Sequence, residues 1–382
     1  MTGLCDRFGR RITYLRVSVT DKCNLRCVYC MPEEGVTPRS HEEILRLEEI
    51  WRIVRVAAGL GIDRVRLTGG EPLVRKGIVD LVRMIASIPG VRDLSITTNA
   101  TLLARHAHDL ALAGLRRVNI SLDSLRPEVY ARITRCGDIR SALEGLEAVE
   151  SAGLHPVKLN AVVVRGVNDG EIEDLARLTL EHAWDVRFIE FMPFWDNGGR
   201  LGPSHVVPIE EIRERVAALG ARVAADGAVC SAAHPAARPA AHPAKDSLAH
   251  PTQHLAGCLA PVRTTDPDGR EAAEDASAVG VGPASYVQFP GAMGRVGFIS
   301  REGDGFCVRC NRVRLTADGK LLPCLLSDLA VDLRGPLRAG ADDDEIAALI
   351  REAVAMKPER GEGGAGAGEC RRVAPPLSDI GG

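Results

Sequence analysis

The chain has 382 residues, 45% of them hydrophobic and 26% charged, so it can bury a large core as one big domain or two ordinary ones. A net charge of −3 gives no overall attraction to nucleic acid or to an acidic membrane surface, so we expect neither as a partner. The amino terminus lacks the apolar core of a signal peptide, and no run approaches the roughly 18 apolar residues of a membrane span, so we expect a cytoplasmic protein.

Strands and helices alternate through the first half of the chain. Runs of β-rich composition predict strands at residues 13–20, 64–68, 94–99, 117–122, 157–164 and 186–191. Segments with helical period predict helices at residues 42–60, 78–88, 140–153 and 169–183. Gly61, Gly114 and Gly153 punctuate the junctions, as is typical of helix ends. Six consecutive βα units predict a parallel sheet that is either open or curled into part of a barrel.

Polar residues follow the predicted strands. The first strand leads into a cysteine-rich loop, and the later ones lead into TGGEP at 68–72, TTNAT at 97–101, SLDS at 121–124 and EFMPF at 190–194. In parallel βα folds the active site lies at the carboxyl ends of the strands. We therefore expect these segments to share one rim.

The composition changes after the sixth βα unit. Residues 224–283 are rich in Ala, Pro, His and Gly without an apolar period, which predicts a flexible insertion. Beyond it we expect a hairpin at 285–300, a second hairpin around the turn TADGK at 316–320 and a last helix at 343–356. The predicted organisation is therefore a barrel domain at 1–223, the insertion at 224–283, a carboxy-terminal region at 284–358 and a flexible tail at 359–382.

Three cysteines lie close together in DKCNLRCVYC, residues 21–30. The thiolates of Cys23, Cys27 and Cys30 can each bind one iron of a four-iron cluster and leave its fourth iron without a protein ligand. Such an open position can bind and activate a small molecule. The alternatives are a zinc knuckle with a fourth ligand from elsewhere, or buried cysteines without a metal.

A second triplet, Cys307, Cys310 and Cys324, lies in GFCVRCNRVRLTADGKLLPCL. It fits a second cluster with an open iron, or a zinc ribbon whose fourth ligand comes from the insertion. The candidates for that ligand are Cys230, His234, His242, His250, His254 and Cys258. The remaining cysteines, Cys5, Cys136 and Cys370, are interpreted as structural or surface thiols.

RVSVTDKCNLRCVYC at 16–30, together with TGGEP, resembles the radical S-adenosylmethionine (SAM) enzymes. The resemblance implies a partial (β/α)6 TIM-type barrel that holds a 4Fe-4S cluster, whose open iron is chelated by SAM. One electron then cleaves SAM to a 5'-deoxyadenosyl radical. Tyr29 would line the adenine, and backbone groups of the TGGEP turn would meet the methionine amino group. The implied SAM contacts also include Gly70, Thr97, Ser121 and Met192.

Three further features resemble the GTP 3',8-cyclases, also named molybdenum cofactor biosynthesis protein A. They are NRVRLT between Cys310 and Cys324 of the second triplet, the EFMP turn, and the terminal Gly381-Gly382. The resemblance covers about residues 1–223 and 282–330 and the last few residues. It implies a carboxy-terminal extension whose second 4Fe-4S cluster binds the guanine of GTP. It also implies that cations hold the triphosphate, since Arg and Lys suit phosphate oxygens. The matching positions are Arg16, Arg64, Arg66, Lys158, Arg187, Arg312 and Arg314, of which Arg312 and Arg314 would also be catalytic.

The implied activity is that of a lyase of molybdenum cofactor biosynthesis. The adenosyl radical takes a hydrogen from C3' of GTP, and the C3' radical adds to C8 of guanine. Reduction of the resulting aminyl-type radical gives 3',8-cyclo-7,8-dihydro-GTP. The implied partners are an external one-electron reductant and the next enzyme of the pathway, cyclic pyranopterin monophosphate synthase; a homodimer is compatible with the chain. The terminal Gly-Gly would reach into the active site. The insertion and the glycine-rich tail depart from the family's usual pattern.

Two other classes of function fit part of the pattern. A radical SAM enzyme that modifies peptides or matures sulfatases shares the first motif, but such enzymes usually carry more cysteines in their carboxy-terminal region. A zinc or iron-sulfur scaffold without catalysis would share both triplets. A scaffold would release no 5'-deoxyadenosine from SAM, and a peptide-modifying enzyme would show little turnover that depends on GTP.

Overall fold

The computed structural model describes residues 3–193, 201–223, 284–300 and 305–360. These residues belong to one compact unit, which comprises residues 1–223 and 283–382. The predicted insertion, with its cysteines and histidines, and the tail with Gly381 and Gly382 lie outside the described residues. The expectations for them therefore stay predictions.

The described strands form one twelve-stranded sheet in the order β12-β11-β10-β1-β2-β3-β4-β5-β6-β9-β8-β7. All six strands predicted in the first half of the chain are confirmed: β1 Tyr14–Ser18, β2 Arg64–Thr68, β3 Asp93–Thr98, β4 Arg117–Ser121, β5 Lys158–Val163 and β6 Asp185–Glu190. The carboxy-terminal strands and one short strand before the insertion are β7 Arg222–Val223, β8 Ser285–Gln288, β9 Arg295–Ile299, β10 Arg312–Leu315, β11 Lys320–Leu322 and β12 Val331–Asp332. Both predicted hairpins form, as the antiparallel pairs β8–β9 and β10–β11.

Helices connect the parallel strands. They are α1 Leu47–Gly59, α2 Ile78–Ala86, α3 Leu103–Leu112, α4 Pro127–Thr134, α5 Ile139–Ser151, α6 Ile172–Glu181 and α7 Ile209–Ala218, followed by α8 Gly305–Val308, α9 Arg334–Arg338 and α10 Asp343–Ala355. Short 3-10 turns lie at Pro72–Val74, Asp169–Glu171 and Pro203–His205. The glycines at three helix ends, Gly61, Gly114 and Gly153, have φ values of 104°, 98° and 70°, which side chains with a Cβ rarely adopt.

Two predicted helices begin later than expected. The helix predicted from residue 42 begins at Leu47, after an extended Arg46 whose backbone N–H donates to Glu49 Oε2 at 2.7 Å. The helix predicted from residue 169 begins at Ile172, because residues 169–171 form a 3-10 turn. The Arg46–Glu49 hydrogen bond precedes the first helix and a 3-10 turn precedes the second, and the periodicity of apolar residues reports neither feature.

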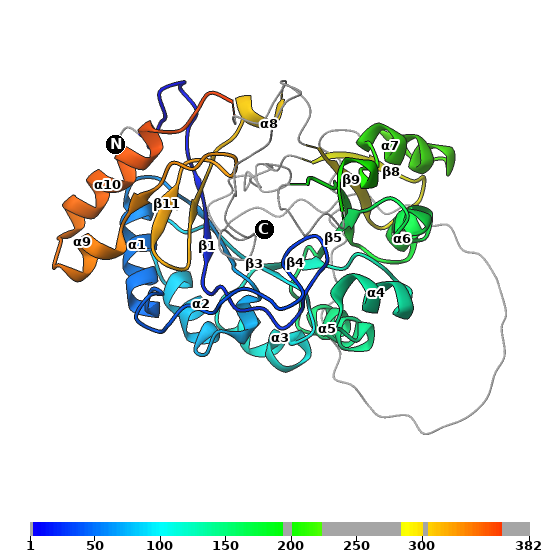
Figure 1. Cartoon of the computed structure of the whole chain (residues 1–382), viewed down its shortest axis with the longest axis horizontal. Helices are drawn as coiled ribbons and strands as arrows, with labels where there is room; N and C mark the ends of the chain where they lie inside the picture. Colours follow the sequence, from blue (N-terminus) through cyan, green and yellow to red (C-terminus); the bar gives the residue numbers. More distant parts are fainter. Residues whose placement is uncertain (1–2, 194–200, 224–283, 301–304, 361–382) are drawn as a thin grey trace, which may run out of the picture. The chain divides into compact units, whose positions relative to one another are not determined.

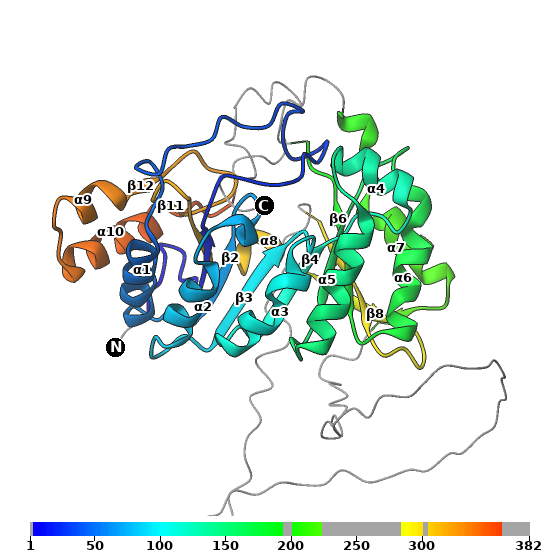
Figure 2. The same cartoon turned by 90° about the horizontal axis from the view of Figure 1, so that it is seen from below.

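The sheet is a partial TIM-type barrel. β1 to β6 are parallel, and they are extended by β10 beside β1 and by β9 beside β6, both also parallel. Helices α1 to α6 lie on the outer side of this sheet (Figures 1 and 2). An open doubly wound sheet would have helices on both faces, so this arrangement decides between the two possibilities that the sequence left open.

Side chains alternate between the two faces of the parallel strands. The outer face is apolar and belongs to the main hydrophobic core, with Leu15, Val17, Val65, Leu67, Val313 and Leu315 each at most 1% exposed. The inner face is polar. It includes Tyr14, Arg16, Arg64, Arg66, Ser95, Thr97, Asn119, Ser121, Lys158, Asn160, Asp185, Arg187, Arg312 and Arg314. Polar groups on the buried side of a sheet are costly without partners, which indicates that this face is built to bind something.

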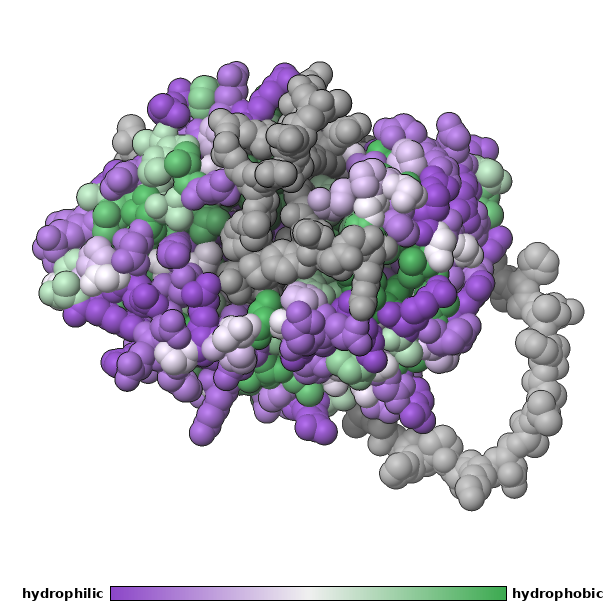
Figure 3. Space-filling model, viewed as in Figure 1, coloured by the Kyte–Doolittle hydropathy of each residue, from purple (hydrophilic) through white to green (hydrophobic). Residues whose placement is uncertain are grey.

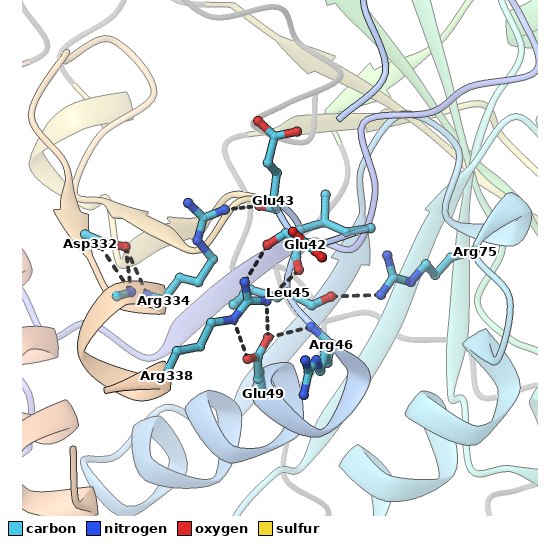
Figure 4. A network of polar contacts seen from close by, with 11 residues as sticks. Glu42, Glu43, Leu45, Arg46, Glu49, Arg75, Asp332, Arg334 and Arg338 are labelled. Carbon is cyan, nitrogen blue, oxygen red and sulfur yellow. Dashed lines mark hydrogen bonds and ion pairs between the residues drawn. The ribbon is translucent and has the colours of Figure 1, made fainter. Parts of the chain in front are cut away.

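Arginines of the carboxy-terminal region hold the segment before α1 (Figure 4). Arg338 donates to both carboxylate oxygens of Glu49, at 2.8 and 3.0 Å, and to the backbone oxygens of Glu42 and Ile44. Arg334 donates to the backbone oxygen of Glu43. Because these carbonyls are bonded to arginine side chains, residues 42–45 have no need of helical hydrogen bonds.

The outer surface over the helices is mostly hydrophilic in the view of Figure 3, with scattered hydrophobic residues. Large exposed apolar side chains such as Leu112, Leu180 and Met293 lie on different elements. Within the described ranges, no helix combines the length and the apolar character needed to span a bilayer.

Candidate active site

The cysteine loop after β1 is held by the TGGEP turn after β2. The backbone N–H of Gly70 donates to the oxygen of Thr20, and that of Glu71 donates to the oxygen of Lys22, both at 2.8 Å. A Cβ on Gly70 would lie 2.3 Å from the Lys22 oxygen, so the close approach requires glycine here. These two N–H groups position the loop, and the carbonyls of Thr68, Glu71 and Pro72 in the turn accept backbone hydrogen bonds as well.

Glu71 of the same turn ties β2 to β3. Its buried carboxylate accepts hydrogen bonds from Thr98 Oγ1 and the Asn99 N–H at 2.7 Å and from the Leu73 N–H at 3.0 Å. Burial raises the pKa of Glu71 to about 7, although these hydrogen bonds counteract it. Glu71 is a structural residue of the site that the sequence analysis did not single out.

Tyr29, in the cysteine loop, is fastened to β4 and β5 through Asp123. The Tyr29 hydroxyl donates to Asp123 Oδ2 at 2.6 Å, and Asp123 Oδ1 accepts from the Val162 N–H at 2.8 Å. Burial raises the pKa of Asp123 to about 6 and raises the pKa of Tyr29 as well. Since its hydroxyl is used within the protein, Tyr29 would offer its ring to a ligand.

The first three thiols are half-buried and close enough to influence one another. Burial raises the pKa of Cys23 to about 11 and that of Cys30 to about 12, and the neighbouring thiols contribute to the raised pKa of Cys27 and Cys30. The Leu25 N–H donates to Cys23 Sγ at 3.4 Å. A metal centre would overcome the raised pKa values, because a coordinated thiol loses its proton.

The second triplet lines one small cavity, of about 40 Å³. Cys307, Cys310 and Cys324 line it together with Arg312 and Arg314. Burial by itself would raise the pKa of Cys310, but the positive charges of Lys357 and Arg312 lower it to about 7. The Leu326 N–H donates to Cys324 Sγ at 3.4 Å, as Leu25 does to Cys23. Hydrogen bonds of this kind are usual on cluster thiolates.

Both donor sets fit a cluster. Within the described part of the chain, no three His, Cys, Asp or Glu side chains are gathered tightly enough to hold a single metal ion. A tetrahedral zinc ion needs its thiolates about 3.8 Å apart, given Zn–S bonds of about 2.3 Å. The thiolates of a 4Fe-4S cluster each bind a different iron and so stand further apart. Each site offers three thiols and an N–H donor to one of the sulfur atoms, which is donor chemistry that such a cluster can use.

A compact array of cations covers the inner face of β10, β1 and β2. Arg16 is in register with Arg314 on one side and Arg66 on the other. Two residues earlier, Tyr14 is in register with Arg312 and Arg64. Residues two apart on a strand face the same side, so all six side chains project from one face. We name these five arginines, Arg16, Arg64, Arg66, Arg312 and Arg314, the arginine array.

Electrostatic repulsion within the array is visible in the pKa values. Burial, reinforced by the charges of Arg314 and Arg66, holds the pKa of Arg16 well below its usual value. Burial and the charge of Arg312 lower the pKa of Arg314 to about 10. Buried like charges this close are stabilised by a bound anion. The arrangement therefore favours a polyanionic ligand.

Lys158 and Arg187 extend the basic surface to β5 and β6. Arg187 Nη2 donates to Asn119 Oδ1 at 2.7 Å, and Lys158 Nζ lies 3.5 Å from Asp185 Oδ2. Burial lowers the pKa of Lys158 to about 8 despite the opposing influence of Asp185. Both side chains are buried, at 6% exposure, on the polar inner face.

The predicted SAM contacts lie on the same face or at its rim. Thr97 is in register with Asn119, and Ser121 with Asn160. The Thr97 hydroxyl is buried with no hydrogen-bond partner within the described ranges. Met192 lies two residues after the end of β6. Cys5 and Cys136, outside both triplets, are exposed.

The two triplets lie at opposite ends of the strands. Cys23 follows the carboxyl end of β1, whereas Cys310 precedes Arg312, the register partner of Tyr14 at the amino end of β1. Cys324 follows β11, which runs antiparallel to β10, and so lies at the same end as Cys310. The arginine array occupies the length of strand between the triplets.

Three further residues of the site were missed from the sequence. Tyr14 could have been found by alternation, because it lies two residues before Arg16 on one strand. Arg10 and Lys357 line the second cavity but belong to segments far from its cysteines in the chain. No local pattern in the sequence indicates such long-range contacts.

Comparison with known proteins places the chain in a family. Residues 17–179 match the Radical SAM superfamily, and residues 262–362 match Molybdenum Cofactor Synthesis C. The chain is 45% identical to GTP 3',8-cyclase of Pelotomaculum thermopropionicum over 355 residues, which cover 93% of this chain and 94% of that protein. It is 42% identical to GTP 3',8-cyclase of Thermodesulfovibrio yellowstonii over 378 residues, 99% of each.

Among solved structures, Streptococcus suis SuiB bound to precursor peptide SuiA has a TM-score of 0.45 and 16% identity, covering 56% of this chain and 47% of SuiB. That likeness is too slight to add to the description of the fold. The two relatives, by contrast, match nearly the whole length of the chain at more than 40% identity. The chain therefore belongs to the GTP 3',8-cyclase family of radical SAM enzymes.

Proposed function

We propose that this chain is a radical SAM GTP 3',8-cyclase, which converts GTP to 3',8-cyclo-7,8-dihydro-GTP in the first step of molybdenum cofactor biosynthesis. The arginine array between two three-cysteine sites is the observation that supports this most directly. It offers a polyanion site inside a barrel, with a place for a cluster at either end. The names of the relatives, GTP 3',8-cyclase, agree with it.

The cofactors would be two 4Fe-4S clusters and SAM. Cys23, Cys27 and Cys30 would hold the first cluster, and Cys307, Cys310 and Cys324 the second. When bound, the first cluster and SAM supply a 5'-deoxyadenosyl radical able to take the C3' hydrogen of GTP. The residues proposed to contact SAM are Tyr29, Gly70, Thr97, Ser121 and Met192.

The chain's own residues would bind and orient GTP. The fork of donors on arginine suits phosphate oxygens, and burial strengthens each contact because little water screens it. We assign triphosphate binding to the arginine array with Lys158 and Arg187. Arg312 and Arg314 line the cavity of the second triplet as well, so we propose that they also position the guanine end and are catalytic.

The proposal includes partners and a location. The reaction needs an external one-electron reductant, and we propose that the product passes to cyclic pyranopterin monophosphate synthase. We further propose a cytoplasmic location and allow a homodimer, which gel filtration would test.

An anaerobic assay tests the proposed function. Reconstituted protein is analysed for iron and zinc and incubated with SAM, GTP and dithionite. We expect two clusters per chain, 5'-deoxyadenosine and a cyclised GTP product. Bound zinc, a single cluster, or SAM cleavage without any GTP-derived product would contradict the proposal.

Cys310→Ser separates the two cluster sites. Because the first triplet is intact in this variant, we expect it to cleave SAM without cyclising GTP. The measurement is the ratio of cyclised product to 5'-deoxyadenosine, with Cys5→Ser, an exposed thiol outside both triplets, as the control. Full cyclase activity of Cys310→Ser would show that the second triplet has another role.

A further inference from the structure

Lys357 is a buried lysine two residues after the end of α10, and it lies against the second triplet. Its side chain is nearly inaccessible, at 2% exposure. The ammonium donates to the backbone oxygen of Arg312 at 2.8 Å and to that of Pro323 at 2.6 Å. Arg312 belongs to the segment that carries Cys310, and Pro323 immediately precedes Cys324. Lys357 thus joins the two arms that carry these cysteines.

The ammonium also lies close enough to Cys310 to influence its thiol. Burial would raise the pKa of Cys310, but the positive charge of Lys357 opposes this effect and lowers the pKa. The carbonyls of Arg312 and Pro323 use two of the three N–H donors of the ammonium. These hydrogen bonds explain how the charge is tolerated in a buried position.

Arg10 contacts the backbone of Cys307, the remaining cysteine of the second triplet. Its guanidinium, anchored on Asp6 at 2.5 Å, donates to the backbone oxygen of Cys307 at 2.9 Å. It also donates to the backbone oxygens of Pro358 at 2.5 Å and Glu359 at 2.9 Å. The segment 357–359 is therefore connected, directly or through Arg10, to the backbone beside all three cysteines.

The charges around this cavity are unbalanced. Among the described residues, Arg10, Arg312, Arg314 and Lys357 line it with one acidic residue, Glu359, and the charge of Arg10 is also paired with Asp6. A 4Fe-4S cluster with three thiolate ligands carries net negative charge, which grows when the cluster is reduced. A buried cation beside its sulfur atoms stabilises the reduced form more than the oxidised form.

We propose that Lys357 is a positioning residue for the second cluster: it fixes the arms carrying Cys310 and Cys324 and raises the reduction potential of the cluster between them. This inference rests on the proposed function, since it requires a cluster at the second triplet. It assigns to the end of α10 a role in the active site that its sequence does not indicate.

The test measures the second cluster itself. In a full-length background with Cys23, Cys27 and Cys30 changed to Ala, only the second cluster remains, and its midpoint potential is followed by electron paramagnetic resonance. We expect Lys357→Met, which fills the volume without charge, to have a more negative potential and to release iron to a chelator several-fold faster. Lys357→Arg should recover most of both properties. The control is Lys320→Met, an exposed lysine on β11, which should change neither.

Lys357→Gln keeps hydrogen-bond donors without the charge and serves if Lys357→Met does not fold. A potential and an iron-release rate equal to those of the unchanged lysine, in either variant, would overturn the inference. If the background protein with Lys357 holds no cluster at the second triplet, the proposed function itself fails. If the background protein holds this cluster and the uncharged variants have the same midpoint potential and iron-release rate, only the proposed role of Lys357 fails.

Discussion

At the scale of single residues, the hydroxyl of Tyr14 is unusual. It is buried, and no hydrogen-bond partner lies within the described ranges. Tyr14 stands between Arg312 and Arg64 in register, and the guanidinium of Arg66 lies 5.3 Å from the centre of its ring. A hydroxyl with no such partner, beside the arginine array, is well placed to donate a hydrogen bond to a phosphate oxygen of a nucleotide.

Tyr14→Phe tests this hydroxyl. A hydrogen bond to a charged group contributes about 1.5–3 kcal/mol, so we expect GTP affinity to fall by about tenfold or more, with KM rising and SAM cleavage retained. The free protein should lose no stability, because among the described residues the hydroxyl has no partner to lose. Anaerobic equilibrium dialysis with GTP gives the affinity, and urea unfolding gives the stability.

Tyr130→Phe is the matched control for Tyr14→Phe. Tyr130 also has a buried hydroxyl without a partner in the described part of the chain, but it lies on α4 and not on the inner face of the sheet. Its GTP affinity should be unchanged. Equal GTP affinity of Tyr14→Phe and the unaltered protein would refute the role of Tyr14.

At the scale of elements, the docking of residues 42–46 shows how the carboxy-terminal region shapes the barrel. The sequence predicted a helix from residue 42, and the periodicity of its apolar residues is correct from Leu47 onward. Before Leu47, Arg338 and Arg334 bond the carbonyls of the chain, and Leu45 N–H donates to the oxygen of Ala317 at 2.8 Å (Figure 4). These contacts cross nearly 300 residues of sequence, so no local pattern could have revealed them.

The pair Arg338–Glu49 should support stability at neutral pH. Burial alone would raise the pKa of Glu49, but hydrogen bonds from Arg338 and the Arg46 N–H lower it below 4.5. A lowered folded pKa stabilises the protein above pH 4.5, and this contribution is lost as pH falls through the folded pKa. We expect Arg338→Ala to reduce the free energy of unfolding by about 2 kcal/mol at pH 7.

Urea unfolding of the unaltered protein and of Glu49→Gln at pH 3–7 tests whether the Glu49 carboxylate stabilises the protein at neutral pH. Glu49→Gln should lose less stability than the unaltered protein when the pH is lowered. Asp80→Asn is the control, since the Arg83–Asp80 pair is exposed, with side chains 60% and 70% accessible, and contributes little. A parallel acid response of Glu49→Gln and the unaltered protein would exclude the assigned role.

At the scale of the whole molecule, the chain leaves the barrel and returns to it at neighbouring strands. β7, before the insertion, pairs antiparallel with β8 after it, and Val223 is in register with Val287. Two chain ends held this close can be joined by a short connection. The barrel therefore needs no large segment between them for geometric reasons.

Deletion of residues 230–278 should leave cluster content and GTP-dependent turnover largely intact. The low complexity of this segment and the β7–β8 pairing both motivate the expectation. Iron content, urea unfolding and cyclised product per 5'-deoxyadenosine are compared with those of the full chain. Loss of either cluster on deletion would instead indicate that cysteines or histidines of the insertion are ligands.

Short-range order is what the sequence by itself determined: the six strands, both hairpins, the glycines that end the helices, the spacing of each cysteine triplet and the family. The alternation of apolar residues and the spacing of cysteines extend over only a few residues, so they can be recognised without knowing which distant segments pack against them. Only the tertiary structure decided that β10 and β9 extend the barrel on both sides and that Tyr14 stands within the arginine array. It alone brought Lys357 to the second triplet. Such contacts depend on which distant segments pack together, and a lysine or tyrosine carries no local mark of its eventual partners.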